Sequence, residues 1–85
     1  MNRKHRNTLT QIFRTPTVAS IKFSDIERLL VAMGGELTEG SGSRVCFEIK
    51  DLKLFVHRPH PGKEAKKYQV EAFREFLELV GVKDE

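Results

Sequence analysis

Two of the three histidines in this 85-residue chain, His57 and His60, lie three positions apart. An imidazole has an unperturbed pKa of about 6.5, so it can take up or release a proton near neutral pH. His57 ends a run of alternating apolar residues, and His60 lies between Pro59 and Pro61, which stiffen its backbone. Either ring could act in proton transfer. The simpler interpretation of each is a loop histidine that contacts only backbone or solvent.

Cations cluster around these two rings. Residues 53–67 include Lys53, Arg58, Lys63, Lys66 and Lys67, with Glu64 as the single acid in this range, and the chain as a whole has a net charge of +3. Clustered positive charge attracts polyanions. Metal-free RNA cleavage needs a base for the 2′-hydroxyl, an acid for the leaving oxygen and cations for the charged intermediate. We therefore predict a surface that faces RNA phosphates, the alternative being a set of solvated charges.

The composition narrows the class of protein. Eighty-five residues make one domain, and no apolar run approaches the roughly 20 residues that span a bilayer. No apolar segment follows the basic N-terminus, so we expect no secretory signal and a cytoplasmic location. Cys46 is the single cysteine, which fits a reducing compartment and is expected to be a small buried hydrophobe. The histidines and cysteine show no zinc-ligand spacing, so we expect neither a metal nor a cofactor.

Apolar periodicity predicts two helices in the first part of the chain. Residues 3–13 carry an apolar stripe at helical spacing and end before Pro16, followed by a linker up to residue 20. Ser24 and Glu27 match a capping box, in which a serine caps the helix and the glutamate reaches back to its amide. We therefore predict a second helix over residues 24–33, ended by Gly34-Gly35.

The rest of the chain predicts a three-stranded meander and a final helix. Residues 36–39, 44–50 and 53–57 alternate as short strands, with a tight turn at 51–52. Residues 58–64 form a loop, and the last helix opens at Lys66 or Lys67 and ends at Gly81, followed by a frayed tail at 84–85. The order α-α-β-β-β-α indicates an α+β fold with an antiparallel sheet and helices on one face.

Four stretches also occur in an order and at a spacing typical of one known family. They are FSDIERLL at 23–30, GG at 34–35, GSGSRV at 40–45, and HRPHP at 57–61 followed by Lys63-Glu64 and a closing helix. Together they resemble the HicA family of toxins over about residues 21–82, leaving residues 1–20 as an extra helix and linker before a domain over 21–85. The resemblance implies a double-stranded-RNA-binding-like fold, an mRNA interferase that blocks translation, and a HicB-type antitoxin protein as partner.

One residue departs from the family pattern. Family members typically carry a histidine directly after the Gly-Ser pair, and the resemblance implies that this histidine is catalytic, whereas this chain has Arg44 after Gly42-Ser43. Arginine stays protonated near neutral pH and cannot act as a general base. Either the base has moved to His57 or His60, with His60 preferred because it matches the family's Pro-His loop, or the protein binds RNA without cutting it.

The remaining site residues are expected to bind phosphate. Arg44 could hold a phosphate with two hydrogen bonds, or pair across strands with a glutamate. The other expected phosphate contacts are Ser43, Arg58, Lys63, Lys66 and Lys67, for which a solvated turn is the plain alternative. A third hypothesis is that the basic face mainly docks an acidic antitoxin.

Overall fold

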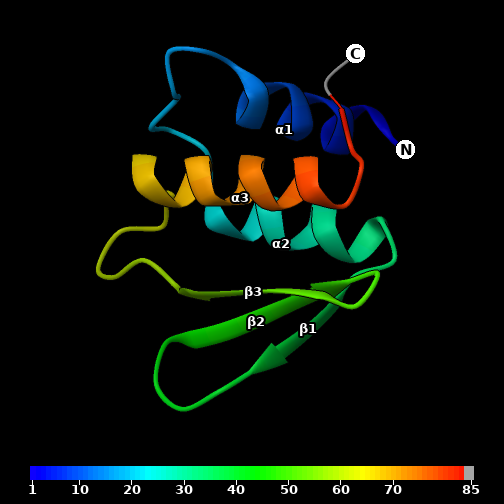
Figure 1. The fold of residues 1–85 in the computed structure, drawn as a ribbon. Helices are drawn as coiled ribbons and strands as arrows, with labels where there is room; N and C mark the ends of the chain where they lie inside the picture. The colour runs from blue at the N-terminus through cyan, green and yellow to red at the C-terminus, as the bar shows by residue number, and fades with distance from the viewer. Residues whose placement is uncertain (84–85) are drawn as a thin grey trace.

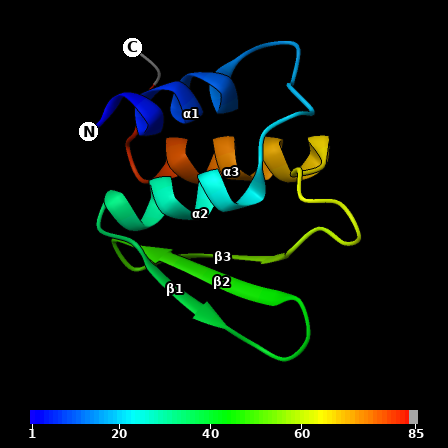
Figure 2. The same cartoon turned by 180° about the vertical axis from the view of Figure 1, so that it is seen from behind.

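The chain folds into three layers in a computed structural model that describes residues 1–83. Its elements are α1 (Arg3–Phe13), α2 (Phe23–Ala32), β1 (Glu36–Glu39), β2 (Arg44–Ile49), β3 (Leu52–His57) and α3 (Lys67–Leu79). The sheet forms one outer layer, α2 and α3 cover one of its faces, and α1 lies on the far side of these two helices (Figure 1 and Figure 2). The predicted α+β fold, with three antiparallel strands and helices on one face, is confirmed.

The sheet has the order β1-β2-β3, and each strand is antiparallel to its neighbour. Ile49 pairs with Leu52, so the turn between β2 and β3 consists of Lys50 and Asp51, one residue earlier than predicted. Both turn residues have positive φ angles, 52° and 66°. This is typical of a type I′ turn, whose twist suits a two-residue hairpin. The usual Asn-Gly pair is absent, and for that reason the sequence placed the turn one residue too late.

The start of α2 differs from the predicted capping box. The helix begins at Phe23 with Lys22 as its N-cap, and no side chain caps its first amides. The Phe23 amide donates to the Lys63 carbonyl at 2.9 Å, and a β-bridge joins Lys22 to Glu64. Phe23 is only 4% exposed, so its burial and this bridge fix the helix start. Ser24 therefore lies inside the first turn, and the Glu27 carboxylate is free to pair elsewhere.

The core lies between the sheet and the helices. Three phenylalanines meet there, with the Phe73 ring centroid 5.7 Å from Phe23 and 5.5 Å from Phe47, both edge to face. Such pairs add about 0.5–1.5 kcal/mol each beyond the burial of their area. The predicted stripe of α3 is confirmed, since its apolar members are all buried: Val70, Phe73, Phe76, Leu77 and Val80.

The first helix belongs to the same core. Leu9 and Ile12 join the cluster of buried residues, and Ile12 is fully buried. Arg74 of α3 donates to the carbonyls of Ile12 at 2.8 Å and Arg14 at 3.1 Å. Carbonyls at a helix C-terminus have no partner within the helix, so this arginine satisfies groups that would otherwise need water. Residues 1–20 are therefore tied to the rest of the chain by apolar and polar contacts.

The last helix begins at Lys67 and runs for 13 residues, and Gly81 follows it with a φ of 91°. The predicted start and stop of this helix are confirmed. Across residues 1–83, none of the helices is both long and apolar enough to cross a membrane. The predicted frayed tail at residues 84–85 lies outside the described residues.

Candidate active site

The helices leave one face of the sheet open. Because side chains alternate along a strand, the residues that pair with one another on this face form three rows across the strands. One row joins Arg44 to His57, and the next joins Thr38, Cys46 and Phe55. The third row, nearest the β2–β3 turn, consists of Glu36, Glu48 and Lys53.

Three of the predicted site residues meet at one end of this open face. The Ser43 hydroxyl oxygen lies 3.1 Å from Nδ1 of His57, within hydrogen-bond distance. Arg44 is the direct ladder partner of His57. The Arg58 amide donates to the Ser43 carbonyl at 2.8 Å, which makes the neighbouring Arg44–His57 pair a narrow, non-hydrogen-bonded one. In such a pair the Cα atoms are about 4.5 Å apart and the two side chains emerge side by side.

A buried glutamine in α3 binds the backbone carbonyl of His57. Gln69, in the first turn of α3, is 2% exposed, and its Nε2 donates to the His57 carbonyl at 2.7 Å. Its Oε1 accepts from the Lys66 amide at 3.0 Å, which also satisfies the start of α3. The end of β3 is therefore anchored to the helix layer while the imidazole remains exposed.

Arg58 is paired with two carboxylates. Its Nε donates to Glu27 of α2 at 2.8 Å, and its Nη1 donates to Glu39 at the end of β1 at 2.9 Å. The hydrogen bonds to Glu27 and then to Glu39 raise the pKa of Arg58 above its usual range. This guanidinium links α2, β1 and the loop after β3, so it positions the site.

A hollow of about 280 Å³ joins the His57 end of the sheet to the β1–β2 turn. Its lining includes Ser41 and Gly40 of the turn, Glu39 at the end of β1, and residues of the first two rows: Arg44, His57, Thr38, Cys46 and Phe55. Among the described residues, Arg44 forms no ion pair, so its charge faces this hollow without a carboxylate partner.

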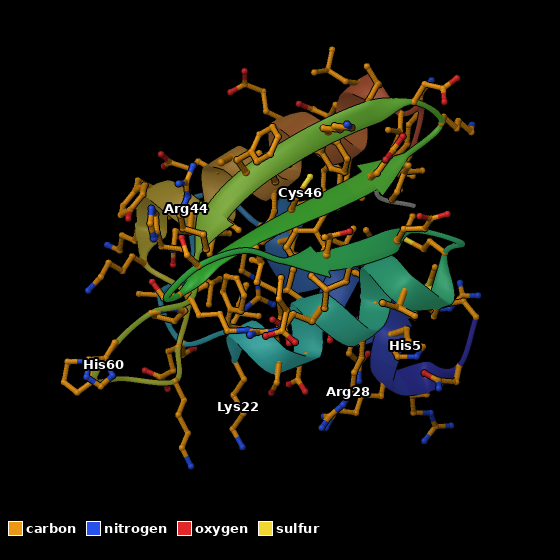
Figure 3. All side chains as sticks on the ribbon, turned by 90° about the horizontal axis from the view of Figure 1, so that it is seen from below. His5, Lys22, Arg28, Arg44, Cys46 and His60 are labelled. Atoms are coloured by element: carbon orange, nitrogen blue, oxygen red, sulfur yellow. The ribbon has the colours of Figure 1, made fainter. Side chains whose placement is uncertain are left out.

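His60 lies apart from this group. Figure 3 looks onto the open face and shows His60 at the outer end of the loop, beyond the strand end that carries Arg44. His60 is exposed and is not among the residues that line the hollow. The geometry thus gives His57, and not the loop histidine, the place beside Arg44.

The predicted lysines form a separate, flanking group. Lys63 lines a second hollow with Ser24, Glu27 and Arg58 at the start of α2. Lys66 and Lys67 are exposed at the start of α3. The structure therefore divides the predicted phosphate contacts between the open face and the loop that borders it.

Sequence reasoning missed the residues that support the site. Gln69 falls at the third helical position after Lys66, a position where a glutamine typically bonds the N-cap amide, so its capping role could have been found. Its bond to His57 could not, because the two residues belong to different elements. Glu27 was assigned to a cap and is instead a partner of Arg58.

No group of three or more His, Cys, Asp or Glu side chains within residues 1–83 is placed to hold a metal ion. Within the same range, every buried side-chain nitrogen and oxygen has a hydrogen-bond partner. Within these residues, the side-chain polar groups with free hydrogen-bonding capacity are therefore ones that solvent reaches.

The match to known families covers most of the chain. Residues 23–82 match the family model described as the HicA toxin of bacterial toxin–antitoxin systems. No curated protein and no solved structure is significantly similar to the chain. The matched span contains both main helices, all three strands and the Ser43–Arg44–His57 group, and α1 precedes it. The chain belongs to the HicA family of bacterial toxin–antitoxin toxins.

Proposed function

We propose that this toxin is an mRNA endoribonuclease that blocks translation, with His57 as its general base. The observation that carries the proposal is the position of one imidazole beside Ser43 and an unpaired guanidinium, Arg44, at the edge of one hollow. Such a set offers proton transfer and phosphate binding within a single nucleotide's reach. The site of action is the cytoplasm, where mRNA is translated.

Each residue has a distinct role in the proposed reaction. Nδ1–H of His57 donates a hydrogen bond to the Ser43 hydroxyl oxygen, which leaves Nε2 unprotonated and free to remove the proton of the 2′-hydroxyl. The 2′ oxygen then attacks the adjacent phosphorus, and the bond to the 5′ oxygen breaks, that oxygen taking a proton from water. Arg44 offers a rigid fork of donors to the phosphate oxygens as their charge grows. The products are a 2′,3′-cyclic phosphate and a 5′-hydroxyl.

The ladder register explains how Arg44 can replace the family histidine. Residues 44 and 57 form a narrow pair, so a ring on β3 reaches nearly the same place as a ring on β2. We infer that the imidazole and the cation have changed strands while their joint position has stayed the same. Lys63, Lys66 and Lys67 extend the phosphate contact beyond the cleaved bond, and Arg58 supports it through its carboxylate partners.

The partner that we propose is a HicB-type antitoxin with an acidic surface. The open face of the sheet combines an unpaired cation with exposed apolar groups, as a protein interface also does. Two other functions share these features: an RNA-binding module that does not cleave, and a protein whose basic face mainly binds the antitoxin. Because Arg44 occupies the family's histidine position, the RNA-binding module is favoured over the protein that mainly binds the antitoxin.

Cleavage of a defined mRNA by the purified protein tests the proposal. We expect His57→Ala to abolish cleavage and growth arrest, and His60→Ala, its matched control, to retain both. Loss of cleavage in His60→Ala, with cleavage retained in His57→Ala, would identify His60 as the general base. RNA that is bound but not cut would indicate an RNA-binding module that does not cleave. The absence of salt-sensitive RNA binding would indicate a protein whose basic face mainly binds the antitoxin.

A further inference from the structure

Phe55 is the large aromatic ring of the open face. It is 69% exposed and lies on β3 two residues before His57, so both side chains point away from the helices. The four phenylalanines of the core, Phe23, Phe47, Phe73 and Phe76, are each at most 4% exposed. A phenylalanine gains free energy from burial, so the exposed ring on this face is a surface on which a partner could gain free energy by covering it.

The neighbours of Phe55 leave its ring accessible. Its ladder partner is Cys46, and Thr38 follows in the same row. Cys46, which was expected to be buried, is half-buried on the open face. Both neighbours are small, so the space beside the ring forms part of the hollow that also contains Arg44 and His57. A flat group could enter this space from solvent and lie against the ring.

The charges on the two sides of the Phe55 row differ in sign. On one side of the Phe55 row lie Arg44 and His57, and on the other lie Glu36, Glu48 and Lys53, whose charges sum to minus one. An anion near Phe55 is therefore attracted toward Arg44 and repelled from the opposite side. Two residues along a strand span about 7 Å, which is on the scale of one nucleotide.

We propose that Phe55 is the stacking platform for the base next to the cleaved phosphate, so that the toxin accepts single-stranded RNA and not duplex. The inference rests on the proposed function, since Arg44 and His57 then hold the sugar–phosphate of the same nucleotide. An unpaired base can leave its neighbours and stack on an aromatic ring, whereas a paired base is covered on both faces. Stacking tolerates any base, so the platform selects unpaired RNA before it selects sequence.

The chain itself offers a direct probe, because it contains no tryptophan. Phe55→Trp places a single indole on the open face, and a base that stacks on it quenches its fluorescence. The ligand is a single-stranded oligonucleotide of about ten 2′-O-methyl residues, within the usual site size of such proteins, which cannot be cleaved by a 2′-hydroxyl reaction. We expect quenching by this strand and none by the same sequence annealed to its complement.

Affinity gives a second measurement. Loss of one base–aromatic stack weakens binding by roughly five- to 160-fold, so we expect Phe55→Ala to lose that much affinity for the single strand. The dependence on salt should remain that of the wild type, because no charge is removed. Leu79→Ala is the control, since Leu79 is 71% exposed but lies at the far end of α3. It should leave binding unchanged.

The outcomes separate the inference from the proposed function. If the wild type binds and cleaves RNA while Phe55→Ala changes affinity by less than about twofold, the platform is refuted and the ribonuclease stands. If Phe55→Ala lost the same amount of affinity for single-stranded and for duplex RNA, the platform would also be refuted. A wild type that binds no RNA would overturn both. If Phe55→Ala loses the antitoxin but keeps RNA, the ring belongs to a protein interface and the inference is wrong.

Discussion

Replacing Gln69 by leucine tests whether the anchor behind His57 fixes the imidazole. The change keeps the approximate size of the side chain but removes its bonds to the His57 carbonyl and to the Lys66 amide. A hydrogen bond contributes about 1 kcal/mol net, and a buried group left unpaired costs about 1–3 kcal/mol. We therefore expect a loss of about 2–4 kcal/mol in the free energy of unfolding.

That loss should leave a folded protein at 25 °C. A chain of this length is expected to have about 4–13 kcal/mol of stability, and each lost kcal/mol lowers the melting temperature by roughly 4–8 °C. Circular dichroism during heating measures the change. RNA cleavage by Gln69→Leu at a temperature well below its melting point should fall by up to about 100-fold with little change in RNA affinity, because the imidazole is displaced while every cation is retained.

Thr8→Val is the matched control, because Thr8 and Gln69 are the two buried polar residues within the described chain. The Thr8 hydroxyl bonds only to the Lys4 carbonyl in its own helix, so we expect a loss below about 1 kcal/mol and unchanged cleavage. If Gln69→Leu is no less stable than Thr8→Val and cleaves like the wild type, the glutamine does not position His57 and the reasoning fails.

Three further predictions concern stability, each measured by urea unfolding. Glu27→Ala should lower the free energy of unfolding by about 1–2 kcal/mol and Glu39→Ala by less than about 1 kcal/mol, because the Glu27 side chain is 17% exposed and the Glu39 side chain 68%. Equal losses would mean that burial does not set the strength of the Arg58 pairs. Arg74→Ala should cost about 2 kcal/mol by leaving the last carbonyls of α1 unpaired, and an unchanged midpoint would show that water replaces it. Asp51→Gly should add about 1 kcal/mol, because glycine adopts the observed φ of 66° without strain; a loss would contradict the turn type.

The helices and strands could be predicted because their patterns are local. The stripe of α3 repeats over several turns, and the strand that contains Val45 and Phe47 alternates without a break. The start of α2 could not be predicted, since the Ser24–Glu27 pattern competes with a contact to Lys63, forty residues away. Local chemistry favoured a capped serine, but burial of Phe23 and the bridge outweigh a capping bond of about 1 kcal/mol.

The arrangement of the site depends on contacts between residues that are far apart in the sequence, and local sequence patterns do not show such contacts. The sequence identified the residue types, and Ser43, Arg44 and His57 do meet. The sequence favoured His60 over His57 because His60 matches the family's Pro-His loop, whereas the ladder register cannot be read from the sequence. A shift of one residue in the β2–β3 turn would place position 57 on the opposite face. Only the observed register puts its ring beside Arg44.

The position of α1 has a consequence for how the toxin can be shut off. This helix covers the back of the helix pair, and among the described residues no helix covers the sheet face that carries the hollow (Figure 1). Two macromolecules cannot occupy such a small patch together. If RNA binds this face as we propose, an antitoxin that binds there would exclude RNA by direct competition, and no change of shape in the toxin would be required.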